Sequence, residues 1–388
     1  MSVGRLARAG LYAGALIGPF GGAITTSILP EIGSSFGRSA GEAASTLTFY
    51  LVPFAVLMLA SGTLAQRWGP QRTVRIAYIA YAVTSALAAS AWTFEVLLAS
   101  RALQGAANSF TTPVLLAVIA ASTPKEKLGR ALGLFGAMQA AGQTSAPLVG
   151  GLSAEIDWRL AFVVISVVAV GLAVLGVPET DAEPERNASL RSAFVPSTIR
   201  PAVIAFIGWA CLGGLSFLVA FRLDDVFGLG AGERGLLLTG FGIVGFLTAR
   251  QVGKAIDRFG ATAVVVVGAT LGGGLIAAVG TSPFAAMVVV AWALTGAAAQ
   301  GVLVSINALV LQSDNANRGG SVSVVQSLRF MGAAVAPLAF VPLYQAHPLA
   351  GFLVPAALLV TVPAIVTWSG RGAGTRRTPQ PEAPPPPR

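Results

Sequence analysis

Charged residues are scarce in this sequence of 388 residues. Asp, Glu, Lys and Arg make up only 11% of it, hydrophobic residues make up 54%, and the mean hydropathy is +0.75. A soluble domain carries about 25% charged residues, so this chain has too few to cover a globule with polar surface. The composition therefore excludes an ordinary soluble protein and predicts an outer surface that faces lipid.

Cysteine and histidine occur only once each, as Cys211 and His347. A single cysteine excludes an intrachain disulfide, and the pair together offers no ligand set for a metal cluster. HExxH, a nucleophile elbow and a GxxxxGK[ST] phosphate loop are missing as well. We therefore expect no metal, no cofactor and no catalytic residue, and a membrane enzyme remains only a distant alternative.

Long apolar runs are what the sequence has in abundance. About twelve of them approach the ~20 residues needed to cross a bilayer. They lie at roughly 11–30, 44–65, 73–92, 95–118, 129–152, 160–177, 201–221, 235–253, 262–280, 284–307, 321–343 and 350–368. The first run begins after a basic segment, but it is too long for a cleaved signal peptide, and its removal would leave an odd number of spans. The pattern predicts a multi-pass membrane protein.

The distribution of basic residues predicts the orientation. Of the 25 Lys and Arg, two lie deep within spans and 19 lie in cytoplasmic segments or at cytoplasmic span ends. The other four lie outside: Arg38, Arg159, Arg222 and Arg234. This bias predicts a plasma membrane protein with both termini in the cytoplasm. The net charge of +9 then reflects topology, and no nucleic-acid partner is expected.

The chain contains an internal repeat. The stretch GTLAQRWGPQR at 62–72 returns in outline 191 residues later as GKAIDRFGATA at 253–263. LQGAAN at 103–108 returns as LTGAAA at 294–299, and Ala-Pro-Leu at 146–148 returns at 336–338. Matches in one order at nearly one spacing indicate two parallel repeats of about six spans each. The predicted units are an N-terminal bundle (1–178), a cytoplasmic linker (179–200), a C-terminal bundle (201–369) and a disordered cytoplasmic tail (370–388).

These repeats and loops resemble the major facilitator superfamily. GTLAQRWGPQR resembles its signature between spans 2 and 3, although Gln66 stands where the family usually has an aspartate. The resemblance implies an all-α integral membrane fold of about twelve helices in two parallel six-helix repeats. It also implies a cytoplasmic gate formed by Gly62, Arg67, Gly69, Arg72, Asp257, Arg258 and Gly260.

The fifth predicted span contains an unusual set of small residues and a proline. Gly133, Gly142, Pro147, Gly150 and Gly151 resemble the fifth-span signature of the drug–proton antiporters in this superfamily. In lipid, small residues let helices approach closely and neighbouring helices satisfy the backbone groups that proline frees. The resemblance favours a pliable hinge in this span, whereas plain packing against span 8 is the alternative interpretation.

Polar side chains inside the spans are candidates for the transport pathway, because intramembrane charge is costly and marks function. Arg101, Gln104 and Asn108 form one stripe on a helix, and RALQG resembles the fourth-span signature in which the arginine takes part in proton transfer. Further candidates are Gln139, Gln143, Trp292 and Arg329, with apolar walls from Phe20, Tyr50, Phe54, Trp209 and Phe217.

The sixteen acidic residues all fall in loops or near span ends. Both deep charges are cationic, which favours neutral or anionic substrates over lipophilic cations. A proton carrier must then lie near an outer mouth, with Asp224, Glu31 and Glu95 as the candidates.

The resulting hypothesis is a monomeric efflux transporter that exchanges small amphipathic, drug-like compounds for protons by alternating access. The alternative within the superfamily is a nutrient or sugar-like importer or facilitator.

Overall fold

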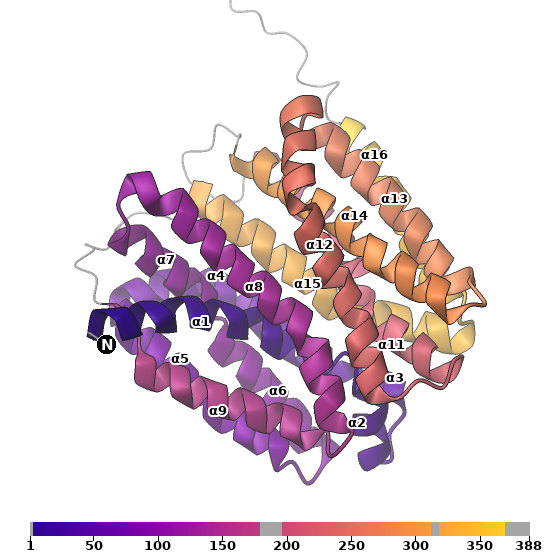
Figure 1. Cartoon of the computed structure of the whole chain (residues 1–388), viewed down its shortest axis with the longest axis horizontal. Coiled ribbons are helices and arrows are strands. Elements are labelled where there is room, and N and C mark those ends of the chain that lie inside the picture. Colours follow the sequence, from indigo (N-terminus) through magenta and orange to yellow (C-terminus); the bar gives the residue numbers. More distant parts are fainter. Residues whose placement is uncertain (1–2, 179–195, 312–317, 369–388) are drawn as a thin grey trace, which may run out of the picture.

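The computed structural model describes residues 3–178, 196–311 and 318–368, and within these ranges the regular structure is helical (Figure 1). The first half of the chain contains α1 (Val3–Ala23), α2 (Leu29–Ser35), α3 (Ala40–Ala43), α4 (Ser45–Trp68), α5 (Pro70–Ala89), α6 (Phe94–Asn108), α7 (Thr112–Ser122), α8 (Lys125–Ala154) and α9 (Arg159–Leu175). The second half contains α10 (Pro196–Cys211), η2 (Gly213–Leu215), α11 (Ser216–Asp225), α12 (Ala231–Phe259), α13 (Ala261–Thr281), α14 (Ala285–Leu311), α15 (Arg318–Ala346) and α16 (Ala350–Trp368).

Each predicted apolar run coincides with one long helix or with two consecutive ones. In the described ranges, seven helical segments have the length and hydropathy to cross a membrane, and two shorter apolar helices lie at Arg159–Leu175 and Ala350–Val366. α1, α5 and α8 are also long enough, with 21, 20 and 30 residues. The all-helical membrane fold expected from the sequence is confirmed.

The two loop signatures adopt the same local structure. Gly69 has φ 86° between α4 and α5, and Gly260 has φ 83° between α12 and α13. An L-residue with a side chain rarely adopts this backbone conformation, so glycine allows one span to end and the next to begin within a single residue. At the first turn, Pro70 starts α5, a position where its missing N–H costs nothing.

Two spans that were expected to be continuous are interrupted. The fourth span breaks at 109–111, where α7 restarts with Pro113 in its first turn. The seventh span leaves the helix at Leu212, passes through the short η2 segment with Gly213 and Gly214, and continues as α11. In a membrane protein such an interruption is tolerated where the backbone lines a cavity rather than lipid.

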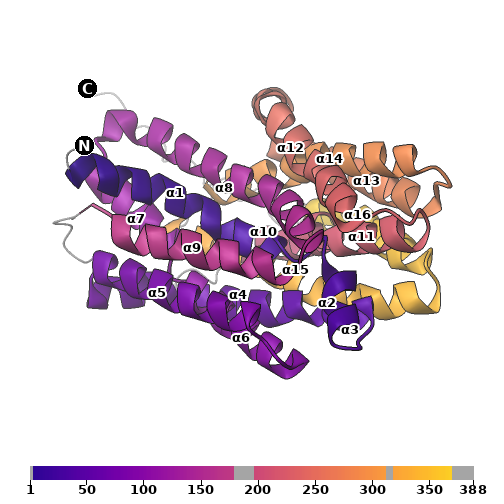
Figure 2. The same cartoon turned by 60° about the horizontal axis from the view of Figure 1, so that its bottom comes forward.

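The two halves pack along two helix pairs, α8 with α12 and α4 with α15. Figure 1 shows α8 and α12 converging towards α2 and α3 and diverging at their opposite ends. We call the converging end, which carries Glu31, Asp224 and Arg234, the gate end, and the end with the Gly69 and Gly260 turns the latch end. Turning the molecule shows α9 and α5 on the outer side of the first half (Figure 2).

The helix ends nearest the predicted unit boundaries are those of α9 and α10. α9 ends at Leu175, close to the expected end of the first bundle at 178. α10 begins at Pro196, five residues before the expected start of the second bundle at 201, because Pro196 is well suited to a first helical turn. Linker residues 179–195 and the tail from 370 to 388 lie outside the described residues.

Candidate functional site: a cavity between the two halves

A cavity lies between the two halves, and the atom-free space in and around it, which includes open solvent, is about 850 Å³. Helices α1, α4 and α8 contribute one wall, and α10, η2, α12, α14 and α15 contribute the other. The interrupted seventh span contributes Gly213, Gly214 and Ser216 to this lining. A methyl group on Gly214 would come within 2.7 Å of the Trp209 carbonyl oxygen, so the double glycine lets the backbone pass close to that helix.

Aromatic side chains dominate the cavity walls. They are Tyr50, Phe54, Trp209, Phe241, Trp292 and Phe330. Phe54 and Phe330 meet edge to face across the two halves with ring centroids 4.9 Å apart, and Phe241 stacks on Trp292 at 4.8 Å. None of the residues lining this cavity carries a charge. An aromatic, uncharged surface suits the apolar part of an amphipathic compound.

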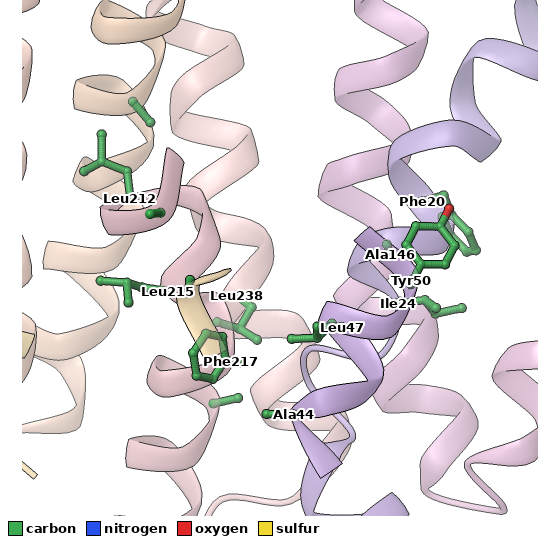
Figure 3. Close-up of a cluster of buried hydrophobic side chains, with 14 of the residues drawn as sticks. Phe20, Ile24, Ala44, Leu47, Tyr50, Ala146, Leu212, Leu215, Phe217 and Leu238 are labelled. Atoms are coloured by element: carbon green, nitrogen blue, oxygen red, sulfur yellow. The ribbon is translucent and has the colours of Figure 1, made fainter. Parts of the chain in front are cut away.

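The gate-end side of the cavity is closed by apolar contacts from both halves. Figure 3 shows Leu47 of α4 and Leu238 of α12 pointing towards each other, with Phe217 and Ala44 close by. Leu47 and Leu238 both line the cavity. Phe20 and Phe217, which the sequence suggested as walls, are buried in the packing of their own halves and do not line it.

Arg101 lies at the centre of a buried hydrogen-bond network in the first half. Its side chain is fully buried, and its Nη1 donates to the Gly21 carbonyl oxygen at 3.1 Å and to Gln104 Oε1 at 2.8 Å. Its Nε donates to the Thr46 carbonyl oxygen at 3.3 Å, while its Nη2 has no hydrogen-bond partner among the described residues. The guanidinium also stacks on the ring of Tyr50, 4.2 Å from its centroid.

The network continues along the predicted polar stripe. Gln104 donates to Ser85 Oγ at 2.8 Å, and Asn108 donates to Tyr50 Oη at 2.6 Å and to the Gly18 carbonyl oxygen at 2.9 Å. Gln104 and Asn108 are fully buried and do not line the cavity. Tyr50 and Gly18, which both line the cavity, therefore join this network to the cavity surface.

Arg329 occupies a comparable position in the second half. Its guanidinium lies between the rings of Trp209, at 4.3 Å, and Phe330, at 4.4 Å, and both rings line the cavity. The side chain is 92% buried, and its Nε has no hydrogen-bond partner among the described residues. A cation whose contacts with the described residues are aromatic faces keeps hydrogen-bonding capacity for another group.

The remaining pathway candidates are divided between the cavity and its surroundings. Gln143 and Trp292 line the cavity, and Trp292 Nε1 donates to the Leu238 carbonyl oxygen at 3.3 Å. Gln139 lies one turn from Gln143 on α8 but is not a lining residue.

The fifth-span glycines mark the places where α8 touches other backbones. A Cβ atom on Gly142 or Gly150 would lie 2.1 Å from a carbonyl oxygen of α1 or of the turn after it. One on Gly151 would lie 2.3 Å from the Ala231 carbonyl oxygen of α12, in the other half. Gly235 of α12 approaches the Pro147 carbonyl oxygen in the same way. Gly133 also lies in α8, in its latch-end part.

Arg234 joins the two halves at the gate end. Only 1% of its side chain is exposed, and it forms ion pairs with Glu31 of the first half and Asp224 of the second. Its Nε donates to the Ser27 carbonyl oxygen at 3.2 Å. Nearby, the Gly232 N–H donates to Glu155 Oε1 at 2.7 Å, again across the halves. These contacts hold the gate end closed.

Arg222 and Arg234 are buried, with exposed fractions of 7% and 1%. The sequence assigned both arginines to the outer side of the membrane and gave no sign of their burial. Arg222 donates to the Ser282 carbonyl oxygen at 2.7 Å, and Arg234 is buried between the halves. Nothing in the sequence distinguishes Arg234 from a solvated arginine. Its two acidic partners, Glu31 and Asp224, lie on other helices, and only the fold brings them to it.

The latch residues are separated from one another in this conformation. Arg67, Arg72, Asp257 and Arg258 are exposed, and none of them forms an ion pair with another described residue. Gly62 lies within α4. Glu95, the third proton-carrier candidate, is 70% exposed and pairs with Arg38 rather than with Arg234. The halves are thus joined at the gate end and not by the latch residues.

Comparison with known proteins places this geometry in context. The family model described as Major Facilitator Superfamily matches residues 11–250. The chain is 30% identical over 231 residues to Multidrug resistance protein 1 of Bacillus subtilis (strain 168), covering 56% of this chain and 58% of that protein. It is 31% identical over 182 residues to the uncharacterized MFS-type transporter EfpA of Mycobacterium tuberculosis (strain ATCC 25618 / H37Rv), covering 46% of this chain and 34% of that protein.

A third relative is the tetracenomycin C resistance and export protein of Streptomyces glaucescens, which is 25% identical over 309 residues, 62% of this chain and 57% of that protein. The matches thus span between about a third and three fifths of these relatives.

Solved structures share the fold over nearly the whole chain. A D-xylose-proton symporter superposes with a TM-score of 0.77 at 15% identity, covering 94% of this chain and 97% of that one. A bacterial homolog of the human lysosomal transporter Spinster, in an inward-facing and unoccupied conformation, superposes with a TM-score of 0.73 at 16% identity, covering 96% and 98%. At these identities the likeness is one of fold.

Proposed function

Because the chain belongs to the Major Facilitator Superfamily, we propose that it exports small amphipathic, neutral or anionic compounds in exchange for protons by alternating access. The observation that carries this proposal is the uncharged aromatic cavity between two halves that are joined at the gate end. Family and fold point to a transporter rather than an enzyme. Relatives named for drug resistance and export support the outward direction.

The positions of the two buried arginines support the proposed substrate class. Arg101 and Arg329 lie directly behind the cavity aromatics Tyr50, Trp209 and Phe330. Cations behind an aromatic wall raise the electrostatic potential in a poorly hydrated cavity, which disfavours lipophilic cations and favours anions. No acidic side chain lines the cavity to offset this potential.

Replacing Arg329 with glutamine tests this substrate class. We expect transport of an anionic compound to fall about tenfold, because the variant removes a cation that raises the electrostatic potential of the cavity from behind its aromatic wall. Transport of the neutral amide of the same compound should change little. The measurement is uptake of this matched pair into inverted vesicles. Arg159→Gln is the control, since Arg159 is partly exposed at the gate end, and an equal loss for both compounds would argue against the proposed role of Arg329.

The cluster at the gate end supports proton coupling. One guanidinium, Arg234, faces two carboxylates, Glu31 and Asp224. The cluster therefore carries one net negative charge, and a single proton neutralises it. Only the pair with Glu31 crosses between the halves, so loss of its charge weakens the closed gate directly.

The surrounding charged groups are engaged elsewhere. Arg222 donates to the Ser282 carbonyl oxygen, Asp225 accepts from Tyr344 Oη at 3.0 Å, and Glu155 accepts from the Gly232 N–H. Glu233 accepts from the Gly230 N–H in its own helix cap. We therefore propose Glu31 and Asp224 as the groups that exchange protons with the outer solution, and Glu95 is not part of this cluster.

Replacing Asp224 with asparagine tests the coupling. We expect uphill, proton-driven export to fall at least tenfold while downhill exchange of substrate continues, because Arg234 keeps its pair with Glu31 but the cluster can no longer gain a proton from a net negative state. Proteoliposomes with an imposed pH gradient provide the measurement. Asp157→Asn, at an exposed gate-end carboxylate outside the cluster, is the control, and unchanged uphill transport in the Asp224 variant would remove Asp224 from the coupling step.

A further inference from the structure

A second hollow lies on the outside of the first half, away from the central cavity. The atom-free space in and around it, which includes open space outside the protein, is about 1250 Å³, and it shares no lining residue with the cavity between the halves. Its walls come from the end of α4, from α5 and from α6 with the turn after it. The lining residues are Arg67, Trp68, Arg72, Thr73, Ile76, Ala77, Ala80, Thr84, Leu103, Ala106, Ala107 and Phe110. We call this hollow the α5–α6 groove.

The groove faces the surroundings of the protein rather than its interior. Trp68, Ile76 and Leu103 are 56%, 55% and 53% exposed. Small side chains, among them Ala77, Ala80 and Ala106, leave the space between α5 and α6 unfilled. An apolar hollow on the outer side of a membrane-spanning bundle is in contact with lipid.

The length of the groove corresponds to one leaflet. Its lining on α5 runs from Arg72 to Thr84, which is about twelve helical steps, or about 18 Å along the helix axis. Half of a hydrocarbon core about 30 Å thick is ~15 Å. The groove thus begins at the latch end and reaches about to the bilayer midplane, which suits an acyl chain of that leaflet.

The charged groups of the groove lie at its latch-end mouth. Thr73 and Thr84 donate their hydroxyl protons to carbonyl oxygens of the preceding helical turn. Arg67 and Arg72 are exposed and form no ion pair with any described residue. Trp68, the last residue of α4, stacks on Phe110 with ring centroids 6.1 Å apart. Two cations above an apolar channel complement an anionic headgroup above an acyl chain.

We propose that the α5–α6 groove binds an anionic phospholipid, with its phosphate at Arg67 and Arg72 and one acyl chain between α5 and α6. The two guanidinium groups provide up to ten N–H donors for the phosphate oxygens, and arginine suits phosphate through its planar fork. A zwitterionic lipid fits the apolar channel equally well, but the positive group of its headgroup would lie close to the two arginines and be repelled by them. The groove should therefore discriminate by headgroup charge.

Quenching of Trp68 fluorescence by brominated lipids tests this proposal. We expect the full-length protein in nanodiscs to show stronger quenching by brominated phosphatidylglycerol than by brominated phosphatidylcholine at the same mole fraction. The excess should disappear in Trp68→Phe, which separates this signal from those of the other five tryptophans. Each of Arg67→Gln and Arg72→Gln should weaken apparent phosphatidylglycerol binding about fivefold, as for one basic residue near an anionic surface.

Two further variants make the experiment decisive. Arg75→Gln removes an exposed arginine of α5 that does not line the groove, so it should leave the excess quenching unchanged. Ala80→Phe keeps both arginines but fills the channel, so it should abolish the excess. Equal quenching by the two lipids, or equal effects of Arg72→Gln and Arg75→Gln, would overturn the proposal. Loss of the signal in Ala80→Phe with no effect of either Arg67→Gln or Arg72→Gln would also overturn it, in favour of a neutral lipid chain.

Discussion

Replacing Arg101 with alanine is expected to reduce transport at least 100-fold while the protein still inserts into the membrane. The guanidinium binds the carbonyl oxygens of Thr46 and Gly21 and the side chain of Gln104, all in buried surroundings. Each buried polar group left without its partner costs about 1–3 kcal/mol. The same change removes the support behind Tyr50, whose ring lines the cavity. Loss of these hydrogen bonds and of the contact with Tyr50 should disorder the cavity wall that contacts substrate.

Lysine at position 101 should restore only part of the activity. Its ammonium has three donors but lacks the planar fork that contacts two carbonyl oxygens and lies flat on an aromatic ring. Transport in proteoliposomes at matched protein amounts provides the measurement, with tryptophan fluorescence and thermal unfolding as checks of the fold. Arg38→Ala is the control, because that arginine is exposed at the gate end with side-chain exposure of 44%. Full activity of the alanine variant would show that Arg101 serves packing alone.

Replacing Gly151 with valine is expected to arrest the transporter with its gate end open. In the described conformation a Cβ atom at this position would lie 2.3 Å from the Ala231 carbonyl oxygen and 3.1 Å from the Gly235 Cα atom, both in the other half. Backbone cannot give way as a flexible side chain can, so α8 and α12 must separate. Separation also pulls Arg234 away from Glu31. Because transport requires both conformations, we expect activity to fall at least tenfold.

Distances between spin labels test this arrest. Labels at Ile156→Cys and Val226→Cys, exposed by 83% and 52% in opposite halves at the gate end, should move apart in the Gly151 variant. Cys211, the only native cysteine, is buried and is replaced by alanine in the background. Gly136→Val on the same helix is the control, since a Cβ atom there meets nothing within 4 Å. An unchanged distance distribution in the Gly151 variant would contradict the proposed crossing point.

The central cavity and the gate cluster complement each other in the proposed cycle. The cavity offers uncharged aromatic walls with cations behind them, and the gate end holds the carboxylates that the cavity lacks. This separation keeps the carboxylates proposed for proton exchange away from the substrate. In the proposed cycle, a neutral or anionic substrate does not displace a proton from the cavity. The exchange of substrate for protons is instead coupled through the opening and closing of the gate end.

Several features followed from the sequence by itself. The composition indicated a lipid-facing surface. The lengths of the apolar runs predicted membrane-spanning helices, and the structure has helices at nearly the predicted positions. The repeated signatures indicated two halves, and the glycines at 69 and 260 proved to occupy equivalent positive-φ turns. These features depend on local chemistry: hydrophobicity over about 20 residues, and a backbone conformation that only glycine adopts at low cost.

Other features were decided only by the tertiary structure. Whether Gln104 and Asn108 face the cavity or the bundle interior depends on how α6 rotates against α4 and α5, and the helical stripe alone left this open. The burial of Arg234 depends on Glu31, some two hundred residues away, meeting it across the halves. The α5–α6 groove likewise depends on the gap that alanines of two helices leave together. Local periodicity determines which residues share a helix face, whereas packing between elements far apart in the sequence determines what that face contacts. The spans could therefore be predicted from the sequence, and the contacts at the gate end could not.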